Sequence, residues 1–225
     1  MTEITERLAE IVERVGRATA RADRDANDVT IVAVSKEQSA AAIAAAYAAG
    51  VRHFGENYLQ EAVPKMQLLE ELPICWHFIG QLQANKTRLV AEHFAWVHTV
   101  DRARIAERLN EQRPQHAAPL NVLIQVNQGG DAHRGGAAPD EVAALARVIV
   151  ALPRLRLRGL MTVPPQHGAP ERWFAELADL RARLRAAGIA LDALSMGMSA
   201  DFEVAIAAGA SLIRVGTAIF GNRGA

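Results

Sequence analysis

The 225-residue sequence has a single cysteine, Cys75, which excludes an intrachain disulfide framework and favours a reducing compartment. It has no excess charge of either sign, because 25 Lys and Arg residues balance 25 Asp and Glu residues. Proteins that coat nucleic acid or anionic membranes rely on summed positive charge, so this balance argues against both partners. No apolar run reaches the roughly 18 residues of a spanning helix, and the N-terminal MTEITERLAEIVERV is a charged amphipathic pattern rather than a secretory signal. These absences predict a soluble, cytoplasmic protein.

Two nucleotide-binding signatures are also missing. No G-x-G-x-x-G dinucleotide fingerprint occurs in the chain. The loop 127–136 has P-loop spacing between Gly130 and Gly135, but Gly136 stands where a P-loop needs lysine. We therefore interpret this segment as a connecting loop rather than a phosphate-binding motif.

The histidine and cysteine patterns predict no metal site and no catalytic thiol. The seven histidines show no H-E-x-x-H spacing, and one cysteine cannot build a Cys/His cluster of the usual kind. His77 and His98 lie inside apolar runs and are expected to be hydrogen-bonded core residues. Cys75 also lies among apolar residues, which raise the pKa of a thiol, so we do not expect a nucleophile there.

What the chain does contain is an alternation of short apolar runs with helical patterns. It opens with a helical pattern that includes Leu8, Ile11, Val12 and Val15. Runs typical of buried parallel strands then cover residues 30–35, 51–55, 74–80, 95–100, 120–127, 155–163, 193–197 and 211–216. Helical stretches separate them, which predicts an α/β protein with one domain over residues 1–225, a (β/α)8 TIM barrel with an extra N-terminal helix. An open doubly wound sheet is the alternative, because sequence alone does not show closure.

Capping residues predict several helix ends. Ser39 is expected to cap an alanine-rich helix that Gly50 closes. Asp101 is expected to cap the helix after the fourth strand, and Gly209 closes the last long helical stretch.

The residues that leave the strands are the candidates for chemistry, because the active site of a parallel barrel lies at the C-terminal strand ends. Lys36 directly follows the run IVAVS, and a neutral lysine amine there can attack an aldehyde, although a solvated surface lysine is the alternative. Arg214, Gly216 and Thr217 predict a phosphate site, since glycine admits close approach and a helix start offers free N–H groups. Ser199 is a candidate for that site and also for the N-cap of the following helix, and the two roles are compatible because a helix N-terminus binds phosphate with the same N–H groups.

Six segments together resemble one family, and they are VAVSK (32–36), HFGENYLQE (53–61), WHFIGQLQANK (76–86), LRGLMTV (157–163), SMGMSADFEVAIAAG (195–209) and RVGTAIFG (214–221). Their combination is similar to the pyridoxal phosphate homeostasis protein family, from about residue 4 to about residue 223. The sequence departs from the family pattern at Glu37, where threonine is common. It departs again in the loop 127–136, where Arg134 keeps the positive charge of a family lysine.

The resemblance implies a barrel like the N-terminal domain of alanine racemase and bound pyridoxal 5′-phosphate (PLP), held as a lysine aldimine. Matching motif positions give the expected cofactor contacts, which are Lys36 (aldimine), Ser199, Gly216 and Thr217 (phosphate), Arg214 (near the pyridine nitrogen), Asn57 (ring pocket), and Met161 and Ser195 (pocket wall). No catalytic residue is expected.

The resemblance favours a PLP carrier or regulator over an enzyme with efficient turnover. A racemase of the alanine racemase type pairs its lysine with a tyrosine from a second domain, whereas this chain ends at Ala225 and its tyrosines, Tyr47 and Tyr58, match no catalytic position. A cationic Arg214 also disfavours protonation of the pyridine nitrogen and weakens carbanion stabilisation. Slow PLP-dependent racemisation or transamination is the alternative, and a phosphate-sugar enzyme would leave the aldimine lysine unexplained. We expect a monomer that binds PLP and amino acids and contacts PLP-dependent enzymes transiently.

Overall fold

The computed structural model describes residues 3–131, 135–165 and 168–221. Its strands are β1 (Thr30–Val34), β2 (His53–Glu56), β3 (Cys75–Phe78), β4 (Trp96–Val100), β5 (Leu120–Gln125), β6 (Leu155–Met161), β7 (Ala193–Ser195) and β8 (Leu212–Val215). Its α-helices are α1 (Glu3–Arg21), α2 (Ala40–Ala48), α3 (Leu59–Leu68), α4 (Thr87–His93), α5 (Ala103–Gln112), α6 (Val142–Val150), α7 (Pro170–Ala186), α8 (Phe202–Ala207) and α9 (Thr217–Phe220). Two short 3-10 helices are η1 (Ala26–Asp28) and η2 (Ala84–Lys86). Each predicted strand run contains one of these strands or overlaps it.

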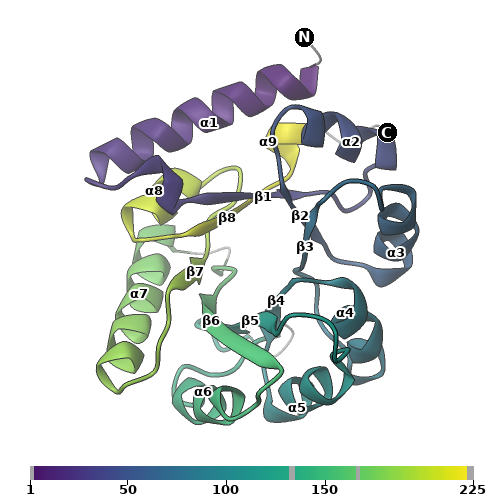
Figure 1. Cartoon of the computed structure of the whole chain (residues 1–225). Helices are drawn as coiled ribbons and strands as arrows, with labels where there is room; N and C mark the ends of the chain where they lie inside the picture. Colours follow the sequence, from purple (N-terminus) through teal and green to yellow (C-terminus); the bar gives the residue numbers. More distant parts are fainter. Residues whose placement is uncertain (1–2, 132–134, 166–167, 222–225) are drawn as a thin grey trace.

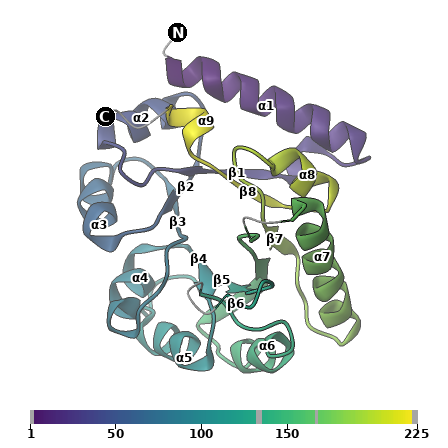
Figure 2. The ribbon, with the colours of Figure 1, turned by 180° about the vertical axis from the view of Figure 1, so that it is seen from behind.

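The strands form a closed parallel barrel in the order β1 to β8 (Figure 1). Each described strand pairs with the next in sequence, and β8 pairs with β1, so the sheet closes on itself. Figure 2, the view from behind, shows the helices as a ring around the barrel. The predicted TIM barrel is confirmed, and the open doubly wound alternative is wrong.

Two apolar layers stabilise the barrel, because side chains along a strand alternate between its two faces. The larger layer lies between the strands and the helices and takes in buried side chains from every helix from α1 to α9. The smaller one lies inside the barrel and consists of Val32, Leu123, Met161, Ala193 and Leu212. Polar side chains occupy much of the remaining interior, and they are the ones that carry the candidate chemistry.

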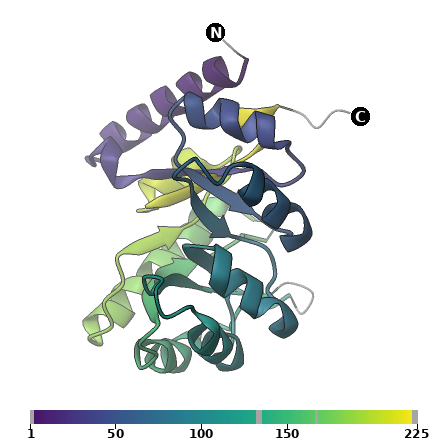
Figure 3. The same ribbon diagram turned by 45° about the vertical axis from the view of Figure 1, so that its right-hand side comes forward.

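The extra N-terminal helix, α1, lies outside the barrel and packs against α8 and α9 (Figure 3). Ile11 and Val15 are buried on its inner face, and Arg14 donates from Nε to Oε1 of Glu203 in α8 at 2.9 Å. Val12 is 54% exposed, because successive residues lie about 100° apart around a helix and residue 12 therefore leaves that face. Among the described helices, none combines the length and apolar character needed to cross a membrane.

The predicted caps are correct for one helix and wrong for another. Ser39 caps α2, since its hydroxyl oxygen accepts a hydrogen bond from the amide of Ala42 at 3.1 Å. Asp101 does not cap α5. The N-cap position is Arg102, and the carboxylate of Asp101 instead accepts from the Arg102 guanidinium at 2.6 Å. An ion pair with its neighbour thus replaces the predicted capping bond.

Candidate functional site

Lys36 lies two residues beyond the end of β1, at the C-terminal end of the barrel. Its half-buried side chain lines a pocket of about 310 Å³ that Ser199, Arg214, Gly216 and Thr217 also line. Among the described residues, no hydrogen-bond or ion-pair partner of the Lys36 amine is found. The fold therefore brings five of the predicted site residues into one pocket, around an amine that is available to react.

Helix α3 holds the backbone on both sides of Lys36. The Lys65 ammonium donates to the carbonyl of Ser35 at 2.9 Å, and the amide of Glu37 donates to Oε2 of Glu61 at 2.8 Å. Glu37 has a φ of +63°, in the left-handed region that residues other than glycine rarely adopt. Because Glu61 and Lys65 are one helical turn apart, they act together to stabilise this turn and so fix where the Lys36 side chain begins.

A buried ion pair supports the same turn. Lys65 Nζ is 3.0 Å from Oε1 of Glu56, whose side chain is fully buried, and the Ser35 hydroxyl donates to that oxygen at 2.7 Å. Burial raises the pKa of Glu56, while Ser35 and Lys65 act in the opposite direction. The second carboxylate oxygen, Oε2, is buried without a partner among the described residues. Ser35 and Lys65 thus together offset part of the cost of burying this carboxylate.

The opposite wall of the pocket is formed in part by the start of α9. A side chain at Gly216 would come within 3.3 Å of the Cβ and carbonyl oxygen of Val34, so glycine keeps this corner open. The amide of Ile219 donates to the carbonyl of Gly216, which leaves the preceding amides of Thr217 and Ala218 without acceptors inside the helix. These amides and the Thr217 hydroxyl are suitable donors for an oxyanion such as phosphate.

Ser199 lines this pocket and is not the N-cap of α8, so the capping role predicted for it is wrong. Asp201 occupies the N-cap position, and its Oδ1 accepts from the amide of Met198 at 2.6 Å. The loop reaches this geometry through Gly197, whose φ is +89° and whose missing Cβ would lie 2.5 Å from the Cβ of Ala205. The hydroxyl of Ser199 is therefore not committed to capping.

Arg214 brings a buried positive charge to the inner end of the pocket. Its Nη1 donates to Ser195 Oγ at 2.7 Å and its Nη2 donates to the carbonyl of Thr162 at 2.8 Å. No carboxylate in the described part of the chain forms a salt bridge with it, and burial lowers its pKa to about 10 although Asp201 acts the other way. A buried cation of this kind favours an anionic or electron-rich ligand.

A chain of hydrogen bonds continues from Arg214 through the barrel interior. Three contacts of 2.9 Å join Ser195 Oγ to His98 Nδ1, His98 Nε2 to His77 Nδ1, and His77 Nε2 to His53 Nδ1. Burial lowers the pKa of both His77 and His98 well below the usual value, so these rings are neutral. The prediction of hydrogen-bonded core histidines is confirmed.

The far end of this chain lies at the N-terminal mouth of the barrel, where His53 and Cys75 begin β2 and β3 and are half-buried. Cys75 Sγ is 3.6 Å from His77 Nε2. Burial raises the pKa of the Cys75 thiol to about 11, which agrees with the expectation that it is not a nucleophile. Sequence spacing missed this grouping because its members come from two paired strands. The C-x-H pattern of residues 75–77, which puts two side chains on one strand face, was the available signal.

The remaining predicted site residues lie around the pocket rather than in its lining. Asn57 lines a neighbouring pocket of about 430 Å³ together with Lys86. Met161 belongs to the inner apolar cluster, and Ser195 is buried beneath the pocket as the acceptor for Arg214. Arg134 lies outside the described residues. A larger pocket of about 610 Å³, beside β6, α6 and α7, contains none of the predicted site residues.

Known proteins resemble the chain over almost its whole length. The family model for the N-terminal domain of alanine racemase matches residues 7–224. The pyridoxal phosphate homeostasis protein of Pseudomonas aeruginosa is 51% identical over 223 residues, which cover 99% of this chain and 97% of that protein. Its counterpart in Escherichia coli is 48% identical over 229 residues, with 99% and 98% covered.

Solved structures of PipY from Synechococcus elongatus are similar as well. Both are 39% identical to this chain and cover 97% of it and 100% of PipY. The TM-score is 0.87 for the structure without PLP and 0.84 for the structure with PLP bound. The similarity thus extends from the motifs to the whole barrel.

Proposed function

The chain belongs to the pyridoxal phosphate homeostasis protein family, and we propose that it binds PLP in the Lys36 pocket and serves intracellular PLP homeostasis. The observation that carries the proposal is that one pocket contains both the Lys36 amine and the hydrogen-bond donors at Gly216 and Thr217 that can bind an oxyanion. PLP carries an aldehyde and a phosphate, so it needs one partner of each kind. The PLP-bound structure of the similar protein PipY supports the same assignment.

In this proposal Lys36 holds the cofactor covalently, as an aldimine. Lysine occurs at only three positions in the sequence, which are Lys36, Lys65 and Lys86. Lys65 is engaged in a buried ion pair, and Lys86 lines the neighbouring pocket, so Lys36 is the best-placed amine. The bound cofactor supplies a reversible carbonyl group and an electron-withdrawing ring. Glu61 and Lys65 keep the Lys36 backbone in place.

We extend the proposal to the other predicted contacts. Ser199, Gly216 and Thr217 bind the phosphate, and Arg214 donates toward the pyridine nitrogen. Asn57 borders the ring from the neighbouring pocket, while Met161 and Ser195 support the site from the barrel interior.

We propose a carrier or regulator without efficient turnover, with slow racemisation or transamination as the alternative. A two-base racemase needs a second base opposite the lysine. Tyr58 lines the neighbouring pocket, and Tyr47 packs its ring on Arg52 at 4.0 Å, so neither borders the Lys36 pocket. A cationic Arg214 also makes a protonated pyridine ring less favourable, which weakens carbanion stabilisation. The names of the similar proteins support a role in homeostasis.

The cellular setting is part of the same proposal. We infer one domain, because the family match covers residues 7–224, and a cytoplasmic setting, because the only cysteine is a free thiol. The monomeric state is proposed from the resemblance to the family alone. Amino acids and PLP-dependent enzymes are the proposed recipients of the cofactor, through transient contact.

The test is the visible absorption of the purified protein supplied with PLP, before and after borohydride, followed by peptide mass mapping. A yellow band should disappear on reduction and leave a phosphopyridoxyl group on Lys36. The Lys36→Ala variant should fold normally and lose the covalent link. Lys86→Ala is the matched control, since it also removes a half-buried lysine near the barrel mouth, and it should keep the band.

Retention of the aldimine band in Lys36→Ala, or mapping of the adduct to Lys86, would show that Lys36 is not the anchor. A protein that does not bind PLP at all would refute the proposed function. Racemase and transaminase assays of the loaded protein then separate a carrier from a slow enzyme.

A further inference from the structure

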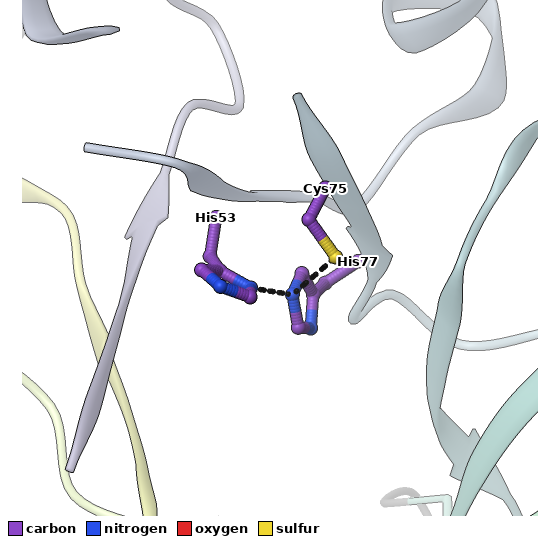
Figure 4. Close-up of side chains that lie close together, drawn as sticks. All are labelled: His53, Cys75 and His77. Atoms are coloured by element: carbon purple, nitrogen blue, oxygen red, sulfur yellow. Dashed lines mark hydrogen bonds between the residues drawn. The ribbon is translucent and has the colours of Figure 1, made fainter. Parts of the chain in front are cut away.

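Three side chains that can bind a metal meet at the N-terminal end of the barrel interior. Figure 4 shows His53 pointing from β2 toward Cys75 and His77 of β3. One ligand atom from each residue lies within 4.8 Å of the other two. In the part of the chain that the structure describes, no other group of three His, Cys, Asp or Glu side chains meets this condition.

The strand register explains why these residues meet. In the parallel pairing of β2 with β3, His53 lies beside Cys75 and Gly55 lies beside His77. Paired residues of neighbouring strands, and residues two apart on one strand, point to the same face. All three side chains therefore enter the barrel interior from rigid elements, which gives the group a fixed geometry without any loop.

The distances are close to those of a tetrahedral zinc site. Zn–S bonds of about 2.3 Å and Zn–N bonds of about 2.0–2.1 Å imply edges of roughly 3.6 Å between S and N and roughly 3.3 Å between two N atoms. The structure has 3.6 Å between Cys75 Sγ and His77 Nε2, and 2.9 Å between His53 Nδ1 and His77 Nε2. For these two edges, a metal ion would need only the two imidazoles to separate by a few tenths of an ångström, and the third edge, between Cys75 and His53, is at most 4.8 Å.

The second nitrogen of His77 is already held as a metal-bound histidine requires. Its Nδ1 is 2.9 Å from His98 Nε2, and His98 Nδ1 is in turn 2.9 Å from Ser195 Oγ. With His77 Nε2 on a metal, His77 Nδ1–H donates to His98 and His98 Nδ1–H donates to Ser195. Outer partners of this kind orient the ring and are a regular feature of histidine metal sites.

We infer that His53, Cys75 and His77 form a binding site for a zinc-type divalent cation, with water as the fourth ligand. Two imidazoles and a thiolate favour zinc or cobalt over magnesium or calcium, which prefer oxygen. On binding, Cys75 Sγ forms a bond to the metal and its proton is released to solvent. The hydrogen bond between His53 Nδ1 and His77 Nε2 breaks, and each imidazole keeps its one proton on the nitrogen that does not bind the metal. The site is reachable, because His53 also lines an open pocket of about 450 Å³ and both His53 and Cys75 are half-buried.

The test is a Co²⁺ titration of the full-length protein, followed by visible and near-ultraviolet absorption. We expect one Co²⁺ per chain, tetrahedral d–d bands, and a thiolate-to-cobalt charge-transfer band that Zn²⁺ abolishes on displacement. Because the sequence has one cysteine, that band reports on Cys75 alone. No Co²⁺ binding, or binding without the charge-transfer band, would overturn the inference.

Variants separate this site from adventitious binding. Cys75→Ser should remove the charge-transfer band, and His53→Gln should weaken Co²⁺ binding by about tenfold or more. His116→Gln is the matched control, because His116 is exposed and lies outside the cluster, and it should bind as the wild type does. Equal Co²⁺ affinity in wild type and His53→Gln would contradict the assignment.

A readout without any variant guards against misfolding. Stoichiometric Zn²⁺, but not Mg²⁺, should slow alkylation of Cys75 by iodoacetamide in the wild-type protein. An unchanged alkylation rate would overturn the inference. The Lys36→Ala variant should give the same Co²⁺ band, since the site does not use the cofactor pocket. This outcome keeps the test of the metal site separate from the test of the proposed function.

Discussion

The two ends of the barrel interior have different side chains, although the same parallel strands form both ends. At the C-terminal end, charged groups dominate, with Lys36 in the pocket, the Lys65–Glu56 ion pair beneath it and the Arg214 guanidinium at its inner end. At the N-terminal end, His53 and Cys75 are neutral groups whose ligand atoms lie close to each other and to His77. One end is therefore suited to a charged organic ligand, and the other to a metal ion that prefers nitrogen and sulfur ligands.

The two ends are nevertheless connected. His77, His98 and Ser195 form an unbroken hydrogen-bonded path between His53 and Arg214. Burial keeps His77 and His98 neutral, so hydrogen bonds between uncharged rings, and no ion pair, link the two histidines. Changes at the charged end should therefore have larger energetic effects than changes at the neutral end or along the path.

The largest effect is expected from Lys65→Met. This change leaves the buried Glu56 carboxylate without its cation and removes the donor to the Ser35 carbonyl. We expect the free energy of unfolding to fall by about 3–5 kcal/mol, as for one partner of a buried ion pair. Urea denaturation measures this. The double variant Glu56→Gln/Lys65→Met should recover much of the lost free energy of unfolding. A loss below about 1 kcal/mol in Lys65→Met alone would show that the buried Glu56 carboxylate does not depend on the charge of Lys65.

Ser195→Ala tests the path between the ends. It leaves Nη1 of Arg214 and Nδ1 of His98 without a hydrogen-bond partner in the interior, which should lower the free energy of unfolding by about 1–3 kcal/mol. Ser211→Ala is the control, because its hydroxyl accepts one bond from the amide of Leu194 in a half-buried position. Denaturant unfolding should give a smaller loss for Ser211→Ala. Equal losses of unfolding free energy in the two variants would mean that the hydrogen bonds of Ser195 stabilise the fold no more than an ordinary serine contact does.

Thr217→Ala tests the ligand side of the charged end. Because the pocket hydroxyl is exposed and has no structural partner among the described residues, the variant should unfold like the wild type. Loss of one charge-assisted hydrogen bond should weaken PLP binding by about 1–2 kcal/mol, roughly tenfold. Fluorescence or absorbance titration measures the change. Unchanged affinity would remove Thr217 from the phosphate site.

The smallest effect is expected from Asp192→Asn, near the start of β7. Hydrogen bonds from Arg158 hold the pKa of Asp192 below its usual value, so the stabilisation is present above about pH 4 and is lost as the pH falls through that lowered pKa. Because the pair is partly exposed, the variant should lose only about 0.2–1 kcal/mol near neutral pH. Unfolding measured across pH should show the difference shrinking in acid. A difference that grows in acid would contradict the assignment.

Local patterns were sufficient for the elements and for much of the pocket. Short β-branched runs predicted the strands, because parallel strands are buried on both faces and need apolar side chains throughout. Residues such as Lys36 and Thr217 were recognisable because they directly follow such runs, and strand ends are where a barrel exposes chemistry. Caps were less predictable. Asp101 and Ser199 have capping chemistry, but an adjacent guanidinium in one case and Asp201 in the other provide the competing contacts.

The alternation of strands and helices, and the positions of Lys36 and Gly216 at strand ends, follow from the local sequence pattern. Which distant side chains share a site depends instead on the tertiary structure. The contacts of Lys65 with Glu56 and Ser35, and those of His53 with His77, depend on strand register and barrel closure. Register and closure are set by packing over the whole chain, so no local spacing encodes them.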